Sequence, residues 1–291
     1  MINWPEALEV ELAARRCIIF IGAGASANAE RLLGDDKKEN PETWKGLLKR
    51  LLVKSREDGS GSIAKATELL EAGQLLECAE IIRSSCIPSA EYNRVLDALL
   101  TRYSPTEIHK AVERLDQKVV VTTNFDTLYE DHCKQGEARD AYSVIKYNDT
   151  GLISRMRSPK RLIIKAHGCV SQPENTVLTK SDFFRARSEY PGFFRTLESL
   201  FLTHTLLFVG YSLSDPDIQL LLENNTITYP SDNPHYAVMA KGTHPAIKAV
   251  FYKTNNVDVI EFDPKNSYQE LTDSLWALCE TVDAIRETNV S

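Results

Sequence analysis

A single histidine follows a short apolar run near the middle of this 291-residue chain. Residues 162–164 are predicted to form a buried strand that leads into Lys165-Ala166-His167-Gly168. Ligands of open α/β sheets bind at the carboxyl ends of the strands. Imidazole titrates near neutrality and can take a proton from water or a hydroxyl, so His167 is the candidate general base. We expect structural roles for the other histidines: His109, His132, His204, His235 and His244.

A second polar segment, Thr122-Thr123-Asn124-Phe125-Asp126, follows the apolar run 119–121. Its amide and carboxylate groups are expected at the same edge of the sheet as His167. Asn124 and Asp126 have an alternative role, because such residues also form Asx turns or cap a helix, here one that begins near Thr127.

Two glycine turns complete the set of candidate site residues. The run 17–21 leads into Gly22-Ala23-Gly24-Ala25-Ser26-Ala27, which fits the G-x-G-x-x-[GA] pattern of a dinucleotide-binding turn. Small residues there let the backbone approach a pyrophosphate at a helix N-terminus. The run 206–209 leads into Gly210-Tyr211-Ser212, where Gly210 admits a ligand and Ser212 can bond a sugar hydroxyl or a phosphate. Beyond it, Ser214 and Asp215 are expected to cap a helix that begins near Pro216.

The residues after the first glycine turn disfavour a dehydrogenase. Such an enzyme places an acidic residue at the end of a second strand, about 20 residues further on, to hold the ribose. Here Pro41-Glu42-Thr43-Trp44 opens a helix instead, and Glu42 suits the start of that helix.

The elements that position these residues are predicted from hydrophobic periodicity. Six short apolar runs predict strands, at residues 17–21, 119–121, 162–164, 206–209, 236–239 and 257–260. They alternate with helix-period segments, so we expect one α/β domain over residues 1–291, with a Rossmann-like, doubly wound, mostly parallel sheet of about six strands. The long stretch between the first two strands has helical periodicity and predicts an all-helical insertion over residues 29–110.

Composition narrows the function classes. The chain is 43% hydrophobic and 26% charged with a net charge of −7, so its summed field repels polyanions and direct nucleic-acid binding is not expected. Six scattered cysteines show no C-x-x-C spacing, which predicts neither disulfides nor a metal site. No signal peptide or membrane span is expected, and we predict a cytoplasmic protein.

Taken together and in this order, the four motifs resemble those of the sirtuin superfamily. The Gly22 turn resembles the NAD phosphate loop, the 122–126 segment the T-x-N-x-D motif, His167-Gly168 the H-G motif, and Gly210-Tyr211-Ser212 the ribose loop. The G-I-P-D-F-R stretch and the four-cysteine zinc module of the deacylases are both missing from the sequence. The pattern is instead similar to sirtuin-like domains of bacterial antiphage defence.

The resemblance implies an NAD⁺ glycohydrolase that cleaves NAD⁺ to nicotinamide and ADP-ribose and so depletes NAD⁺ in abortive infection. NAD⁺ is then the substrate, and no metal takes part. His167, Asn124 and Asp126 are implied as catalytic residues. The implied NAD⁺-binding residues are Gly22, Ala23, Gly24, Ser26, Thr123, Gly210, Tyr211 and Ser212.

The resemblance also implies a homo-oligomer with a separately encoded regulatory partner. A HerA-type hexameric ATPase is the first candidate partner and a short Argonaute the second. Two other functions stay open: an NAD-dependent protein deacylase, since kinship of fold does not fix function, and a non-catalytic module that senses NAD⁺ or ADP-ribose.

Overall fold

The computed structural model describes residues 1–33, 37–55, 61–100, 103–135 and 141–288. In this part of the chain, the central feature is a seven-stranded sheet in the order β5-β6-β4-β1-β7-β8-β9, with every neighbouring pair parallel. The strands are β1 (Cys17–Ile21), β4 (Val119–Thr122), β5 (Tyr142–Lys146), β6 (Arg161–Lys165), β7 (Thr205–Val209), β8 (His235–Ala240) and β9 (Val257–Phe262).

The expected Rossmann-like α/β fold is confirmed, and all six predicted strands are present. The sequence did not reveal β5. This strand lies at the edge of the sheet, and four of its five residues are only half-buried. It therefore lacks the continuous apolar run that marks a strand covered on both faces.

The order in which the chain adds strands to the sheet reverses at β1. From β1 the chain reaches β4, β6 and β5 on one side and β7, β8 and β9 on the other. The four strands that carry the candidate motifs are consecutive in space, in the order β6-β4-β1-β7. Such a switch point opens a crevice outside the carboxyl ends of the strands, which is where ligands of this architecture bind.

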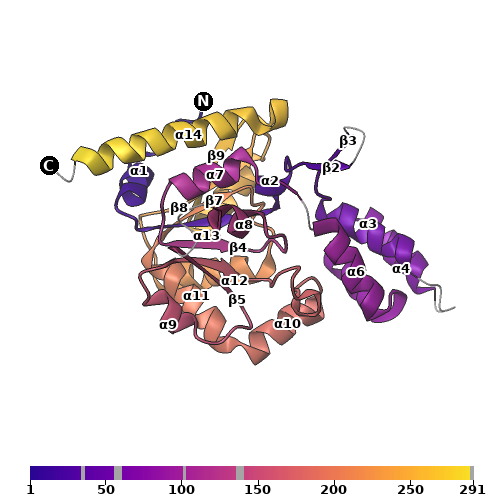
Figure 1. Ribbon diagram of the computed structural model, residues 1–291. Coiled ribbons are helices and arrows are strands. Elements are labelled where there is room, and N and C mark those ends of the chain that lie inside the picture. The colour runs from indigo at the N-terminus through magenta and orange to yellow at the C-terminus, as the bar shows by residue number, and fades with distance from the viewer. Residues whose placement is uncertain (34–36, 56–60, 101–102, 136–140, 289–291) are drawn as a thin grey trace.

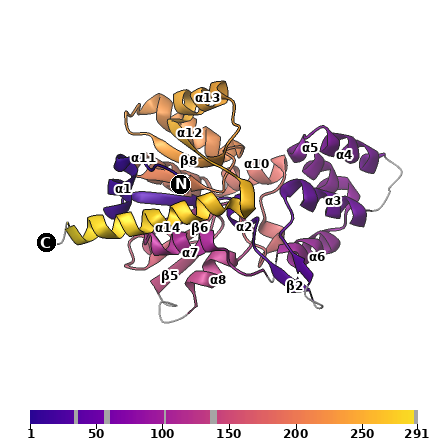
Figure 2. The same ribbon diagram turned by 90° about the horizontal axis from the view of Figure 1, so that it is seen from above.

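Helices cover both faces of the sheet (Figures 1 and 2). Those that share an apolar cluster with one face are α9 (Leu152–Met156), α10 (Lys180–Glu189), α11 (Pro191–Thr203) and α12 (Pro216–Thr228), and α13 (Pro245–Asn255) lies against α12 and β9. Those on the other face are α1 (Glu6–Ala13), α7 (Glu107–Arg114), α8 (Leu128–Cys133) and α14 (Lys265–Thr288). This double cover explains why β1, β4 and β7 are apolar on both sides. None of the described helices is long and apolar enough to cross a membrane.

The segment between β1 and β4 forms a helical lobe with an apolar cluster of its own, on the right of Figure 1. Its helices are α3 (Trp44–Lys54), α4 (Ser62–Glu71), α5 (Leu75–Ile81), the π-helical turn Ile82–Cys86 and α6 (Ser89–Leu100). Phe125 and Leu178, from the loops after β4 and β6, pack into this cluster. Lys180 at the start of α10 donates to Glu77 at 2.5 Å. The lobe therefore stands next to the carboxyl edge of the sheet.

This segment departs from the expected all-helical insertion over 29–110 in two respects. A short antiparallel hairpin joins β2 (Arg31–Leu33) to β3 (Lys37–Glu39), before the helices of the lobe. Strands of three residues are too short to show an alternating pattern in a sequence. In addition, α7 packs on the sheet with α14 and belongs to the main layer.

A buried ion pair fastens β6 to the segment after β4. Lys165 Nζ lies 2.6 Å from Glu130 Oε1 on α8 and also donates to the backbone oxygen of Asp126. The exposed fractions of the Lys165 and Glu130 side chains are 0% and 4%. Removal of one charge therefore leaves the other charge buried without a counter-ion.

We predict that Lys165→Met lowers the free energy of unfolding by about 3–5 kcal/mol, because it leaves the Glu130 carboxylate buried without its partner. Urea denaturation of the purified variant measures the change. Lys160→Met is the matched control, since Lys160 is exposed just before β6, at the end opposite to Lys165, and surface substitutions change stability by about 0.5 kcal/mol or less. Equal stability of the two variants would contradict this role for the pair.

Candidate active site

The two glycine turns lock into each other by backbone contact. After β1 the chain enters the short helix α2 (Ala23–Ser26), and Gly24 N donates to Gly210 O at 2.8 Å. A Cβ atom placed on Gly22 would lie 2.3 Å from Gly210 O, and one on Gly210 would lie 2.2 Å from Ala25 N. Gly210 also has a φ of +63°, in the left-handed region. The glycines of both motifs thus serve the contact between the two loops.

Parts of these turns still face outward at the carboxyl edge. Ala23 and Ser212 are exposed, while Gly24 and Gly210 are half-buried. Tyr211 is different, because its ring lies in the core, 4.7 Å from the ring centroid of Phe20, and its hydroxyl has no hydrogen-bond partner. The accessible face of the interlocked turns therefore consists of backbone and small side chains.

Ser26 is the centre of a polar cluster that holds the segment after β4. Its hydroxyl donates to Asp126 Oδ2 at 3.1 Å and accepts from Asn124 Nδ2 at 3.4 Å. Asn124 Nδ2 also donates to Gly22 O at 3.1 Å, while Asp126 Oδ1 accepts from the backbone of Leu128 at 3.1 Å. Asn124 and Asp126 are thus brought together with the glycine turn. The Asx contact to Leu128 confirms the alternative role of Asp126 as well.

His109, which the sequence reasoning assigned to structure, is the third partner of Ser26. Its Nδ1 accepts from the backbone N–H of Thr106 at 3.1 Å, so in the neutral ring Nε2 carries the proton. Nε2 lies 3.5 Å from Ser26 Oγ. Burial lowers the pKa of His109 to about 4, which keeps the ring neutral at physiological pH. The hydroxyl of Ser26 then has one acceptor and two donors around it and no capacity left for a ligand.

His167 meets a carboxylate from the loop after β7. Its Nε2 lies 3.1 Å from Asp215 Oδ2, without the alignment of a hydrogen bond, and the two side chains are 8% and 10% exposed. Asp215 Oδ1 accepts from the N–H groups of Asp217 and Ile218 at 3.0 and 3.1 Å and so caps α12, as expected. Burial lowers the pKa of His167, and the charge of Asp215 opposes that shift. The contact bridges the ends of β6 and β7, which lie on either side of β4 and β1.

Three buried polar atoms in or near this pair have no hydrogen-bond partner among the described residues. They are His167 Nε2, Tyr211 Oη and Asp217 Oδ2. Asp217 forms an ion pair with Arg187, yet burial raises its pKa to about 6. Buried polar groups are normally paired, so three unpaired atoms in one cluster indicate a place that takes up water or a polar ligand.

The predicted site residues thus form two groups at the carboxyl edge. Asn124, Asp126 and Ser26 lie on the side of α7, and His167 lies on the side of α10, its ring 5.0 Å from that of Phe183. Thr123 is half-buried between the two segments. Within the described residues, no hydrogen bond joins Asn124 to His167, and no group of three or more potential ligands is arranged to hold a metal.

Two hollows of the structure lie away from these residues. One, of about 380 Å³, is lined by arginines and acids at the amino-terminal edge of the sheet. The other, of about 370 Å³, lies between the loop after β5 and the start of α11. We place the candidate site by its chemistry, since polar residues at the switch point indicate ligand binding more directly than concavity does.

Sequence reasoning gave Asp215 and His109 structural roles only. Asp215 does cap its helix, and the signal for a second role was its position just beyond a strand that carries a ligand motif. For His109 the signal was weaker. Its contact with Ser26 joins residues 83 positions apart, which no local pattern shows.

The fold is a doubly wound α/β architecture, and the candidate site lies at the switch point of its sheet, where ligands of this architecture bind. In comparison with known proteins, residues 118–260 match the family model of the SIR2-like domain. This match agrees with the sirtuin resemblance of the motifs after β4, β6 and β7.

Several curated relatives are similar to this chain. The protein named NAD(+) hydrolase ThsA from Acinetobacter baumannii (strain 532279) is 26% identical over 233 residues, which cover 79% of this chain and 44% of the relative. The protein of the same name from Enterococcus faecium is 30% identical over 172 residues, 57% of this chain and 33% of the relative. Defense-associated sirtuin 2 from Bacillus subtilis is 28% identical over 220 residues, 71% of this chain and 19% of the relative. The match therefore spans less than half the length of each.

We predict that Gly24→Ala destabilises the fold by about 1–3 kcal/mol, because the added methyl group overpacks the contact between the two loops. A Cβ atom there would lie 2.8 Å from Gly210 O. Gly192→Ala is the control, since nothing lies within 4 Å of its Cβ position and its φ is not positive. Thermal unfolding compares the two variants. If Gly24→Ala is as stable as Gly192→Ala, the interlock is not tight.

Proposed function

We propose that this chain hydrolyses NAD⁺ to nicotinamide and ADP-ribose. The observation that carries the proposal is the placement of His167, Asn124, Asp126 and Asp215 beyond the carboxyl ends of β6, β4 and β7, which lie within one run of four neighbouring strands. The curated relatives named NAD(+) hydrolase support the reaction. The unpaired polar atoms beside His167 support a polar ligand there.

The chemistry asks little of the protein beyond positioning and one base. Nicotinamide leaves NAD⁺ as a neutral molecule, so its departure needs no acid, and the ribose passes through an oxocarbenium-like state. His167 is suited to act as the base on water or a ribose hydroxyl, because burial keeps its ring neutral by lowering its pKa. With Nε2 facing Asp215, the proton belongs on Nε2 and the free lone pair on Nδ1. Nδ1 is therefore the atom that we assign to proton transfer.

The Ser26 cluster supplies the second element, orientation of the ribose. Asn124 is held by Gly22 O and Ser26 Oγ, and its amide oxygen is left to orient the ribose and the attacking water. Asp126 retains lone pairs on both oxygens for the carboxamide of nicotinamide. Ser26 acts by fixing these two side chains, since its own hydroxyl is fully engaged.

The remaining contacts to NAD⁺ are assigned by accessibility. We assign the pyrophosphate to the backbone of Gly22, Ala23 and Gly24, and the adenosine-side ribose to Gly210 and Ser212. Ala23 and Ser212 are the most exposed of these residues. Thr123 is half-buried beside them, and Tyr211 contributes its backbone or its unpaired hydroxyl.

We further propose that this hydrolysis depletes NAD⁺ in antiphage defence, as the name of the Bacillus subtilis relative suggests. Assembly into a homo-oligomer, control by a HerA-type ATPase or a short Argonaute, and a cytoplasmic location remain predictions from the family resemblance.

We predict that His167→Ala and Asn124→Ala each lower the rate of NAD⁺ hydrolysis by about 100-fold or more, because each removes a group that acts on the reacting ribose. Chromatography of the products measures nicotinamide and ADP-ribose, and far-ultraviolet circular dichroism checks the fold. His204→Ala is the control histidine, on the loop before β7. Activity equal to wild type in both site variants would refute the proposal, and an acylated ADP-ribose formed only with peptide would indicate a deacylase instead.

We predict that Asp215→Asn moves the acidic limb of the kcat/KM profile to lower pH and lowers its plateau. The carboxylate raises the pKa of His167, so its removal lets burial lower that pKa further, and the neutral base persists in more acidic solution. Asparagine still caps α12, which preserves the helix. Asp232→Asn is the control, since it makes the same change of charge at an exposed residue of the loop before β8. An unchanged acidic limb would show that Asp215 is only a helix cap.

A further inference from the structure

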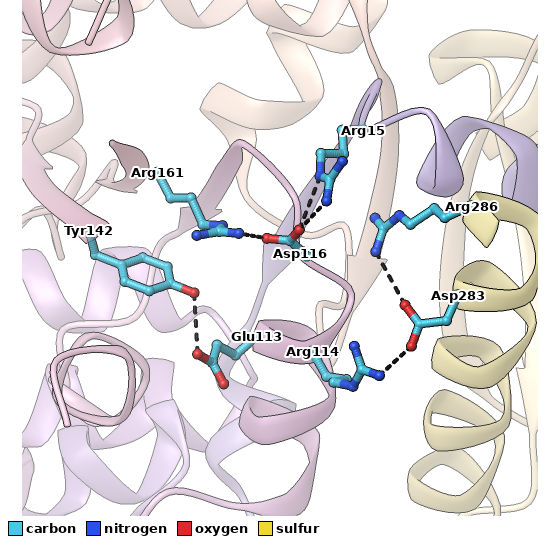
Figure 3. Close-up of a pocket in the computed structure, with 8 residues that line it drawn as sticks. All are labelled: Arg15, Glu113, Arg114, Asp116, Tyr142, Arg161, Asp283 and Arg286. Carbon is cyan, nitrogen blue, oxygen red and sulfur yellow. Dashed lines mark hydrogen bonds and ion pairs between the residues drawn. The ribbon is translucent and has the colours of Figure 1, made fainter. Parts of the chain in front are cut away.

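A hollow of about 380 Å³ lies at the edge of the sheet opposite the candidate active site. Eight side chains from the amino-terminal ends of strands and from the neighbouring helices line it (Figure 3). Arg15 precedes β1, Asp116 precedes β4, and Tyr142 and Arg161 begin β5 and β6. Glu113 and Arg114 come from α7, and Asp283 and Arg286 come from α14. Nothing in the proposed hydrolysis uses these residues.

Arginines outnumber carboxylates in this hollow, and the carboxylates are shared. Asp116 accepts a hydrogen bond from Arg15 Nε at 3.0 Å and also forms an ion pair with Arg161. Asp283 pairs with Arg114, and with Arg286 Nη1 at 3.6 Å. Asp116 and Asp283 thus pair with all four guanidinium groups (Figure 3).

The third carboxylate of the hollow, that of Glu113, contacts residues other than the four arginines. Glu113 accepts from the hydroxyl of Tyr142 at 3.4 Å, and its other oxygen lies 3.4 Å from His132 Nε2. The hollow therefore carries excess positive charge in a chain whose net charge is −7. Burial, followed by repulsion from Arg15, lowers the pKa of Arg286, which is the electrostatic consequence of this crowding.

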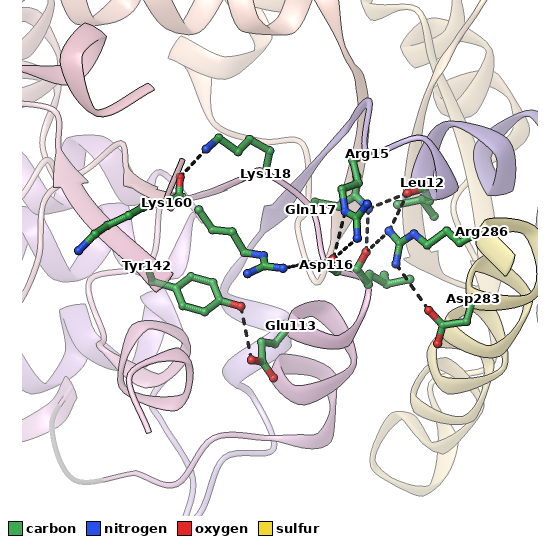
Figure 4. A network of polar contacts seen from close by, with 12 residues as sticks. Leu12, Arg15, Glu113, Asp116, Gln117, Lys118, Tyr142, Lys160, Asp283 and Arg286 are labelled. Carbon is green, nitrogen blue, oxygen red and sulfur yellow. Dashed lines mark hydrogen bonds and ion pairs between the residues drawn. The ribbon is translucent and has the colours of Figure 1, made fainter. Parts of the chain in front are cut away.

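The four arginines differ in how many of their N–H groups already donate to the protein. Arg286 donates to the backbone oxygens of Ala13 and Leu115 and to that of Leu12, which Figure 4 shows beside it, so Arg286 has a structural role. Arg114 and Arg161 each use a single nitrogen on an aspartate, and Arg15 uses two. Their side chains are 56%, 35% and 53% exposed, respectively. Planar guanidinium forks with free N–H groups match the oxygens of a phosphate.

We propose that this hollow binds an anionic phosphate group, carried by a phosphate monoester of nucleotide size. Four guanidinium groups and three carboxylates line the hollow, so one positive charge is left for the anion. The volume suits a small ligand, and the ring of Tyr142 lines the hollow beside the arginines, where a base can stack. The site is independent of the NAD⁺ crevice, since it lies at the other end of the same strands.

Calorimetric titration of the full chain at low ionic strength tests this site, with inorganic phosphate and adenosine 5′-monophosphate as separate probes. We expect Arg15→Gln and Arg161→Gln to weaken binding about tenfold or more, because each removes a charge-assisted contact. We expect Asp116→Asn to tighten binding, because it removes a competing carboxylate. Asn is well suited to the φ of +53° at this position.

Arg94→Gln is the matched control, since it makes the same change of charge at a side chain that is 77% exposed and forms an ion pair with Glu91, away from the hollow. Tighter binding of the nucleotide than of phosphate indicates a nucleotide-borne group, and equal binding indicates free phosphate. No binding, or binding that Arg15→Gln and Asp116→Asn both leave unchanged, overturns the proposal. NAD⁺ hydrolysis of the same variants reports on the proposed function separately, so the two can fail independently.

Discussion

The arrangement of the candidate site depends on the contact between the Gly22–Gly24 turn and Gly210. At this point two backbones approach so closely that a single Cβ atom on either would overlap the other. The contact sets the distance between the ends of β1 and β7, on which both polar groups depend. Asn124 bonds to the carbonyl oxygen of Gly22, and Asp215 stands five residues after Gly210. A dinucleotide-binding pattern of glycines is usually attributed to the approach of a pyrophosphate. Here the same small residues are needed before any ligand arrives.

The candidate site residues form two groups, one beside the helices on each face of the sheet. Ser26, His109, Asn124 and Asp126 form a hydrogen-bonded network around the fully engaged hydroxyl of Ser26, which restrains the Asn124 and Asp126 side chains. On the side of His167, by contrast, the side chains of His167, Tyr211 and Asp217 each have a buried polar atom without a hydrogen-bond partner among the described residues. A rigid group that orients the substrate and an unsatisfied group that reacts with it are complementary requirements of catalysis. We therefore assign positioning to the first group and proton transfer to the second.

The sequence predicted the fold better than it predicted the contacts of the site. Strands such as β1 and β7 are covered on both faces, so their apolar runs are unmistakable, whereas the half-exposed edge strand β5 and the three-residue strands β2 and β3 leave no such trace. The motifs after β1, β4, β6 and β7 were placed at one edge by the logic of parallel sheets alone. The pairing of their side chains was beyond reach, because Ser26 with His109 and His167 with Asp215 are contacts between distant segments. A helix cap such as Asp215 satisfies every local rule and gives no hint of its second neighbour.

Catalysis in this proposal requires that His167 and Asn124 act on the same ribose from the two sides of the switch point. A crystal structure of the unsubstituted chain with a non-hydrolysable analogue of NAD⁺ tests this requirement most directly. We expect the ribose of nicotinamide to lie across the ends of β1 and β4, with Nδ1 of His167 within hydrogen-bond distance of a ribose hydroxyl or of a water molecule beside its anomeric carbon. A nucleotide bound with its nicotinamide ribose away from His167, or an imidazole still sealed from it, would contradict the proposed mechanism.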